Sequence, residues 1–140
     1  MPRAEFHLAE APRYRDDPLR LPCELAHELF AGGETAVILA RSLEQAEQLD
    51  EKLWEFDDDA FVPHQIAGDE DDAITPVLIV PPDTAAPARN VAINLRDTAA
   101  LDGFARVLEI VPADPARRED SRRRWKAYQQ AGFALKKCDR

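Results

Sequence analysis

The sequence is poor in glycine and cysteine and contains no long apolar run. Its 140 residues include five glycines, and none of them lies in the pattern of a dinucleotide-binding fingerprint or a phosphate loop. Gly32 and Gly33 follow a predicted helix instead of a strand, so they read as a helix stop. Backbone cradling of a phosphate is therefore not expected, and no cofactor is predicted.

Cysteine and apolar content point to the compartment. Cys23 and Cys138 are far apart and lie in no metal-ligand spacing, which is typical of free thiols in a reducing compartment. No stretch approaches the roughly 20 apolar residues that span a bilayer. The N-terminus carries Arg3 and Glu5 early and does not resemble a secretory signal. We expect a cytoplasmic protein, with residues 1–140 forming one domain.

Catalytic and metal-binding constellations are also missing. The three histidines, His7, His27 and His64, have no metal-ligand spacing, and no serine or cysteine sits in a nucleophile elbow. The acidic runs at 57–59 and 69–72 hold consecutive carboxylates, which point in divergent directions, so we expect solvated loops and not a cation site. The sequence predicts a non-catalytic interaction module without a metal.

Short apolar runs alternate with helical patterns along most of the chain. The predicted strands span 5–9, 35–40, 77–80, 90–95 and 108–111, and the predicted helices span 21–31, 42–54, 103–108 and 115–131. Ser42 and Gln45 form a capping box, and Leu43, Ala46, Leu49 and Leu53 share one helix face. Residues 10–18 and 83–89 are expected to be loops. The pattern predicts an α/β fold, a single Rossmann-like layer structure with a mostly parallel central sheet flanked by helices.

The charges are sorted along the chain. The net charge is −9, yet residues 115–140 carry nine basic and three acidic residues, a net of +6, so the remainder carries −15. Asp114, Pro115 and Gly132 delimit a helix in this basic segment. On it, Arg118, Arg122 and Lys126 recur every four residues beside Trp125. Such a stripe is either an ordinary solvated face, with Trp125 and Tyr128 in the core, or a binding site for an acidic ligand.

A second group of aromatic residues follows the helix that ends near Trp54. Phe61, Val62, Pro63 and His64 lie just beyond the acidic turn, and Pro63 holds the chain extended. Trp54 and Phe61 either cover one end of the sheet or form an exposed anchor for a protein partner, because Trp and Phe are frequent in interface hot spots.

Taken together, several stretches resemble the chi subunit of the bacterial DNA polymerase III holoenzyme over nearly the whole chain. The resemblance is carried by residues 23–25, 45–46, 49–51, 53–54, 61–64, 67–68, 110–112, 124–128 and 131–133. It implies a Rossmann-like fold without nucleotide chemistry and an adaptor that binds two partners. One partner is the psi subunit, which leads to the clamp loader. The other is the acidic C-terminal tail of single-stranded DNA-binding protein.

The resemblance also implies site residues. The tail site would comprise Val111, Arg118, Arg122, Trp125 and Lys126, where a guanidinium clamps the terminal carboxylate of the tail. The psi surface would comprise Trp54, Phe61, Val62, Pro63 and His64. Two alternatives remain at this point. One is direct binding of single-stranded nucleic acid by the basic helix, and the other is a small nucleotide-dependent enzyme.

Overall fold

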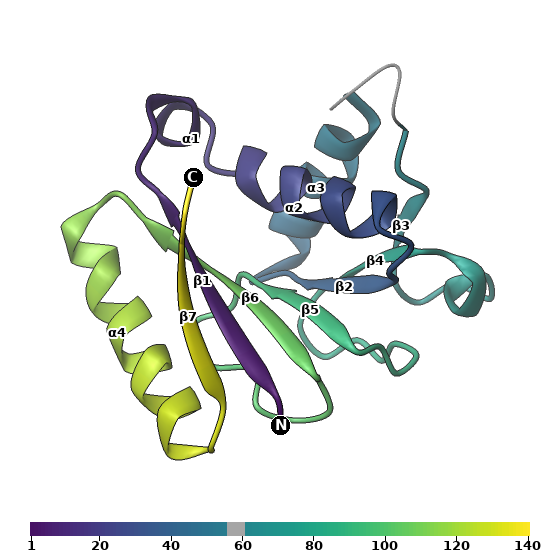
Figure 1. Ribbon diagram of the computed structural model, residues 1–140. Helices are drawn as coiled ribbons and strands as arrows, with labels where there is room; N and C mark the ends of the chain where they lie inside the picture. Colours follow the sequence, from purple (N-terminus) through teal and green to yellow (C-terminus); the bar gives the residue numbers. More distant parts are fainter. Residues whose placement is uncertain (56–60) are drawn as a thin grey trace.

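The computed structural model describes residues 1–55 and 61–140, and its strands form one seven-stranded sheet (Figure 1). The strand order is β3-β4-β2-β5-β6-β1-β7, and all neighbouring strands are parallel. The strands are β1 (Arg3–Ala9), β2 (Ala36–Leu39), β3 (His64–Ile66), β4 (Val77–Val80), β5 (Val91–Asn94), β6 (Arg106–Pro112) and β7 (Ala134–Asp139). The sheet confirms the predicted α/β class.

Helices cover both faces of this sheet. α2 (Arg20–Ala31) and α3 (Leu43–Glu55) pack on one face, and α4 (Pro115–Gln130) packs on the other, against β6 and β7 (Figure 1). The chain runs from β1 through β2 to β3 toward one edge, and from β6 to β7 toward the opposite edge. Crossovers between parallel strands are right-handed. The crossover from β6 to β7 runs across the sheet in the opposite direction to the crossovers from β1 to β2 and from β2 to β3. Helix α4 therefore lies on the opposite face of the sheet from α2 and α3.

The central strands are buried at almost every position. In β4 and β5 all residues are buried, and in β2 only Leu39 is partly exposed. Strands with helices or loops on both sides need continuous apolar runs, which is why these strands were recognisable in the sequence. Among the described residues, no helix is both long and apolar enough to cross a bilayer.

The start of α3 differs in detail from the prediction. The Ser42 hydroxyl accepts a hydrogen bond from the Gln45 backbone N–H at 3.1 Å, as in a capping box. The Gln45 side chain, however, accepts from the backbone N–H of Arg41, one residue earlier than the motif prescribes, at 2.8 Å. Ala46, Leu49 and Leu53 are buried as predicted, but Leu43 is exposed because it begins the helix outside the core.

The predicted helix at 103–108 is wrong. Residues 101–105 form an irregular segment with bends, and β6 begins at Arg106, where it pairs with β5 on one side and β1 on the other. The predicted loop at 10–18 contains a short helix, α1 (Pro12–Asp16). The edge strands β3 and β7 were not predicted, and a 3-10 turn (Asp72–Ile74) lies in the acidic loop.

Candidate protein-binding surfaces

α4 is held in place by signals at both ends. The Asp114 side chain accepts a hydrogen bond from the backbone N–H of Ala116 at 3.0 Å, and Pro115 occupies the first helical position. Gly132 has a φ of +86°, and the Phe133 N–H then donates to the Tyr128 carbonyl at 3.0 Å. A left-handed glycine of this kind ends a helix without steric cost. These contacts confirm the predicted helix.

A buried carboxylate fixes the rotation of α4 against the sheet. Glu109 on β6 accepts hydrogen bonds from Arg124 Nε at 2.9 Å and from the Tyr128 hydroxyl at 2.6 Å. The Asn94 amide on β5 donates to the same carboxylate at 2.6 Å. Burial raises the pKa of Glu109 despite the Arg124 charge, and burial followed by the nearby Glu109 charge raises the pKa of Tyr128. With Arg124 and Tyr128 facing the sheet, the remaining faces of α4 are left to solvent.

Trp125 lies at the border between the core and the solvent. Its half-buried ring packs edge-on against Phe6 of β1, with ring centroids 5.0 Å apart. Val111 of β6 packs against the same apolar cluster. From β7, the ammonium group of Lys137 lies 5.7 Å from the Trp125 ring centroid. The structure therefore brings Val111 and Trp125 onto one partly exposed apolar surface next to a cation that sequence reasoning had missed.

The arginines predicted for this site differ in how firmly they are held. Arg118 donates from Nε to the Pro112 carbonyl at 3.2 Å and from Nη2 to the Glu10 carboxylate at 2.5 Å. Arg122 makes a single 3.0 Å ion pair with Glu119, and 70% of its side chain is exposed. Exposed pairs of this type contribute only about 0–1 kcal/mol, so Arg122 is readily redirected to an incoming anion.

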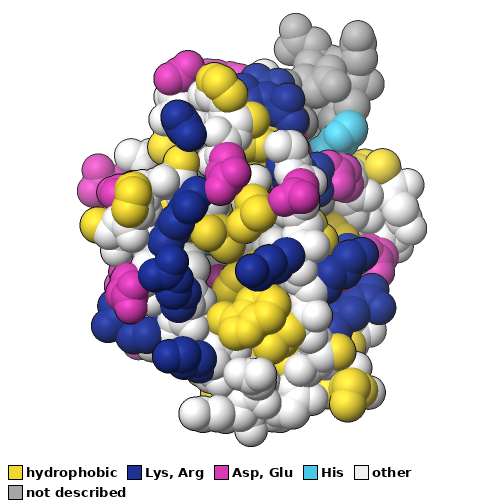
Figure 2. All heavy atoms as spheres, turned by 60° about the vertical axis from the view of Figure 1, so that its left-hand side comes forward, with side chains coloured by type: hydrophobic (Ala, Val, Ile, Leu, Met, Phe, Trp, Pro, Cys, Tyr) yellow, Lys and Arg dark blue, Asp and Glu magenta, His cyan; other side chains and the backbone are white. Residues whose placement is uncertain are grey.

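Cations border an apolar patch on this face of the molecule (Figure 2). Arg123 is as exposed as Arg122 and pairs with Asp120. Lys126 is also exposed, and no ion pair involves it within the described part of the chain. The predicted tail-site residues Val111, Arg118, Arg122, Trp125 and Lys126 thus all lie on α4 or on β6 beside it.

The second predicted surface is an exposed aromatic pair at the opposite edge of the sheet. Trp54 at the end of α3 is 61% exposed and Phe61 is 45% exposed, and their rings stack with centroids 4.9 Å apart. The His64 ring lies beneath both, at 5.4 Å from Trp54 and 5.7 Å from Phe61. Two large aromatic rings held together in solvent are typical of a protein interface.

The other three residues predicted for this surface support the pair. Val62 is buried, and its carbonyl lies 2.7 Å from His64 Nδ1, while His64 Nε2 lies 3.1 Å from the Asp50 carbonyl. The Pro63 carbonyl accepts a hydrogen bond from the Val77 N–H at 3.3 Å, which joins this segment to β4. The side chains of Val62 and His64 are therefore largely buried, and they form the layer on which Trp54 and Phe61 pack.

The structure tests only one of the two acidic segments that were predicted to be solvated loops. Residues 57–59 lie outside the described residues. In the 69–72 run, Asp72 is buried and not solvated as predicted: it accepts hydrogen bonds from the Gly68 N–H and the Gln65 amide, both at 2.8 Å. The Gly68 hydrogen bond is the main reason why the pKa of Asp72 lies below its usual range. Asp72 thus stabilises its own loop.

Comparisons with known proteins support one family. The family model described as "DNA polymerase III chi subunit, HolC" matches residues 1–136. The DNA polymerase III subunit chi of Escherichia coli (strain K12) is 35% identical over 119 residues, which is 83% of this chain and 81% of the relative. The subunit chi of Pseudomonas aeruginosa is 31% identical over 140 residues, covering 96% of this chain and 94% of the relative.

Solved structures show a likeness in fold alone. The C-terminal domain of the DEAD-box protein Dbp5 aligns with a TM-score of 0.59 at 14% identity, covering 99% of this chain and 90% of that domain. A complex of S. cerevisiae Dbp5 with Nup159 and Gle1 gives a TM-score of 0.65 at 13% identity, covering 99% of this chain and 42% of the matched one. The length and strength of the sequence matches show that the chain belongs to the family of DNA polymerase III chi subunits.

Proposed function

We propose that this chain is a non-catalytic adaptor of the replication machinery. It binds the acidic C-terminal tail of single-stranded DNA-binding protein on the α4 face, and the psi subunit on the aromatic pair formed by Trp54 and Phe61. Through psi it joins single-stranded DNA-binding protein to the clamp loader. The observation that carries this proposal is the arrangement around Trp125, where an apolar surface is bordered by exposed cations that have weak partners or none within the described residues.

The chemistry of the α4 face suits a peptide that ends in an apolar side chain and a carboxylate. The half-buried Trp125 and the neighbouring Val111 offer apolar contact to the terminal ring of the tail. A guanidinium forms two parallel hydrogen bonds with a carboxylate, and Arg122 has to give up only a surface ion pair to do so. Arg118 is already engaged by Pro112 and Glu10, so its contribution is smaller.

The positions of the two surfaces support an adaptor. Trp54 and Phe61 flank β3 at one edge of the sheet, whereas α4 packs by β6 and β7 near the other edge. Strands in a sheet are about 4.8 Å apart, so six intervals separate the edges by roughly 29 Å. The two surfaces therefore do not overlap, and two partners can occupy them at the same time.

The test is a titration with a peptide that carries the C-terminal sequence of single-stranded DNA-binding protein. The chain has two tryptophans, so the Trp54→Phe variant leaves Trp125 as the only tryptophan, and its fluorescence then reports this site directly. A control peptide lacks the terminal Pro-Phe pair. We expect saturable binding that requires those two residues and weakens with added salt.

Two neighbouring arginines provide matched variants. Arg122→Ala is expected to cost about 1.5–3 kcal/mol of binding free energy, the range for a charge-assisted hydrogen bond. Arg123→Ala removes an equally exposed arginine from the next position and is expected to cost less than about 1 kcal/mol. Unchanged affinity in Arg122→Ala would contradict the clamp, and an equal loss in both variants would indicate general attraction by charge.

The psi surface is tested separately. Trp54→Ala and Phe61→Ala each remove one half of the stacked pair and are expected to weaken psi binding, with tail binding unchanged. Loss of both activities in either variant would indicate damage to the fold, which circular dichroism would reveal. Tight binding of a single-stranded oligonucleotide by the isolated chain would favour the alternative, direct nucleic-acid binding by α4.

A further inference from the structure

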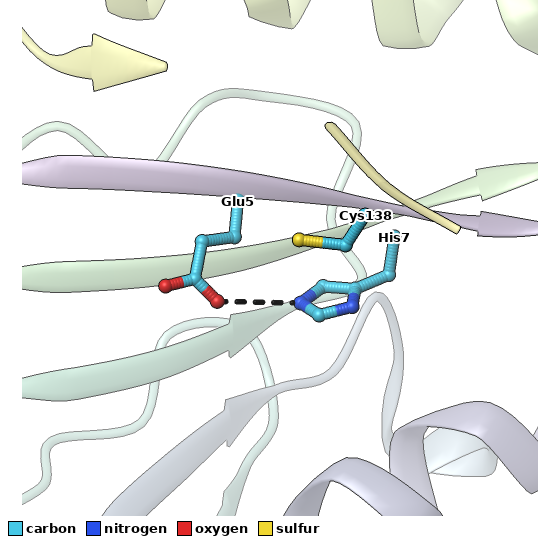
Figure 3. Close-up of side chains that lie close together, drawn as sticks. All are labelled: Glu5, His7 and Cys138. Atoms are coloured by element: carbon cyan, nitrogen blue, oxygen red, sulfur yellow. Dashed lines mark ion pairs between the residues drawn. The ribbon is translucent and has the colours of Figure 1, made fainter. Parts of the chain in front are cut away.

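A cluster of three possible metal ligands lies on the face of β1 and β7 opposite to Trp125 (Figure 3). Glu5 and His7 are two residues apart on β1, so both side chains project from the same face of the sheet. In the parallel register His7 is paired with Cys138 of β7, which brings the thiol beside the imidazole. One carboxylate oxygen, one imidazole nitrogen and the sulfur atom all lie within 4.8 Å of one another.

His7 is the member of the cluster whose environment calls for a ligand. His7 is only 5% exposed, yet neither of its ring nitrogens has a hydrogen-bond partner among residues 1–55 and 61–140. Nε2 points toward Glu5 Oε1 at 3.5 Å, too far for a good hydrogen bond (Figure 3). Burial lowers the pKa of His7, and the charge of Arg140 acts in the same direction. A buried imidazole without hydrogen-bond partners has lost its hydration without compensation, and a bound ligand supplies that compensation.

Glu5 is oriented by its other contacts. Arg106 donates to Oε2 at 2.8 Å and to Oε1 at 3.0 Å, and Arg3 lies 3.3 Å from Oε2. Burial raises the pKa of Glu5, but the hydrogen bonds and charge of Arg106 outweigh burial, so the carboxyl is ionised. A carboxylate has about four lone-pair sites, which leaves Oε1 one site directed toward His7. Contacts of this kind hold metal-binding carboxylates in position.

The charged side chains around the cluster balance one another, so a dication does not meet a net positive charge. Three guanidinium groups lie near the cluster, those of Arg3, Arg106 and Arg140, and each would repel a metal ion. Three carboxylates balance them: Glu5 itself, Glu34, which pairs with Arg106 at 3.2 Å, and Glu28, which pairs with Arg140 at 2.6 Å. When a metal ion displaces the thiol proton, Cys138 would add one further negative charge to the cluster.

We propose that Glu5, His7 and Cys138 bind a zinc ion, with water as the fourth ligand. Sulfur, imidazole nitrogen and carboxylate oxygen form a donor set that zinc accepts in tetrahedral geometry, whereas calcium and magnesium require mostly oxygen. Bonds of about 2.0–2.3 Å place tetrahedral ligand atoms about 3.3–3.8 Å apart, so side-chain rotations that close about 1 Å complete the site. On binding, the thiol proton of Cys138 passes to solvent.

The bound ion would fasten the C-terminal strand to the N-terminal strand. β7 is an edge strand whose only strand neighbour in the described sheet is β1, and Cys138 lies near its end. β7 also carries Lys137, whose ammonium group stands over the Trp125 ring on the other face. Zinc at this position would therefore strengthen the strand that forms one border of the α4 face.

The test uses the full chain freed of metal by chelation. Zinc titrated by calorimetry is expected to bind with one ion per chain, and cobalt in its place is expected to give a thiolate-to-metal charge-transfer band in the near ultraviolet. Cys138→Ser and His7→Gln are each expected to weaken binding by at least about tenfold. Cys23→Ala and His27→Gln change the same residue types outside the cluster and are expected to bind as the unaltered chain does.

A second measurement needs no variant. Alkylation of the native chain followed by peptide mass spectrometry reports the reactivity of Cys138, which zinc is expected to suppress. Absence of saturable binding at submillimolar zinc, or unchanged binding in Cys138→Ser, would overturn the proposal. Binding without protection of Cys138 from alkylation would do so as well, because the ion would then lie elsewhere on this acidic protein.

Discussion

Replacing Arg124 by methionine tests the buried carboxylate that holds α4 to the sheet. Glu109 is completely buried, and only 11% of the Arg124 side chain is exposed. Removing one partner of a buried ion pair costs about 3–5 kcal/mol, because the other charge stays in the interior without compensation. Tyr128 and Asn94 still donate to Glu109 in the variant, so we expect a loss near the lower limit, about 3 kcal/mol of unfolding free energy.

The loss should depend on pH. Glu109 already has a raised pKa, and without Arg124 the pKa rises further. The pKa of this carboxyl is higher in the folded state than in the unfolded state, so its protonation favours folding. This contribution to stability is fully present below the unfolded-state pKa and is lost as the pH rises through the folded-state pKa. Arg124→Met should therefore be more destabilising at pH 8 than at pH 5.

Urea unfolding followed by circular dichroism at both pH values measures these losses. Arg123→Met is the matched control, since its exposed pair with Asp120 is worth about 0–1 kcal/mol. The double variant Arg124→Met with Glu109→Gln removes the stranded charge and should be more stable than Arg124→Met alone at neutral pH. Equal losses in the Arg123 and Arg124 variants, or a loss that grows toward acidic pH, would refute the reasoning.

Three further predictions concern local features. Gly132→Ala should cost about 1–2 kcal/mol, because φ is +86° there, whereas Gly32→Ala, at φ −83°, should be neutral or slightly stabilising; thermal unfolding distinguishes them. Burial raises the pKa of Cys23 to about 12, so a thiol reagent at mildly alkaline pH should titrate only Cys138 in the native chain and both cysteines after denaturation. The pKa of Asp72 is lowered, so its contribution to stability is present above its unfolded value of about 3.8 and is lost as the pH falls further; acid unfolding of Asp72→Asn should lack this component.

The central part of the fold was readable from the sequence because its constraints are local. β2, β4 and β5 are covered on both faces, so they appear as short continuous apolar runs. α4 is delimited by Asp114 and Gly132, whose roles as cap and helix end are confirmed. These elements are specified by residues that lie within or next to them.

The elements that were missed depend on distant partners. β7 (Ala134–Asp139) is a polar edge strand with two adjacent lysines, and it is a strand because β1 pairs with it. The first three residues of β6, 106–108, were predicted to belong to a helix that began at Gly103. Pairing on both sides with β1 and β5 decides its conformation. Long-range pairing of this kind leaves little trace in a window of neighbouring residues.

The candidate site was predictable only in part for the same reason. The positions of Arg118, Arg122 and Lys126 on one helix follow from their spacing. The weak pairing of Arg122 compared with the firm contacts of Arg118 does not, since Glu10 and Pro112 come from other parts of the chain. Lys137 was missed because its strand was missed.

The partners of β1 also set an order of events during synthesis. Arg3 pairs with Arg106 of β6, and Phe6 pairs with Lys137 of β7, so both neighbours of the first strand are made more than a hundred residues later. Contacts of such high sequence separation form slowly, and unpaired apolar strands are exposed to aggregation in the meantime. β1 leaves the ribosome long before either of its neighbours, and in a chain stalled before β6 the apolar residues Ala4 and Phe6 have neither partner strand to pair with.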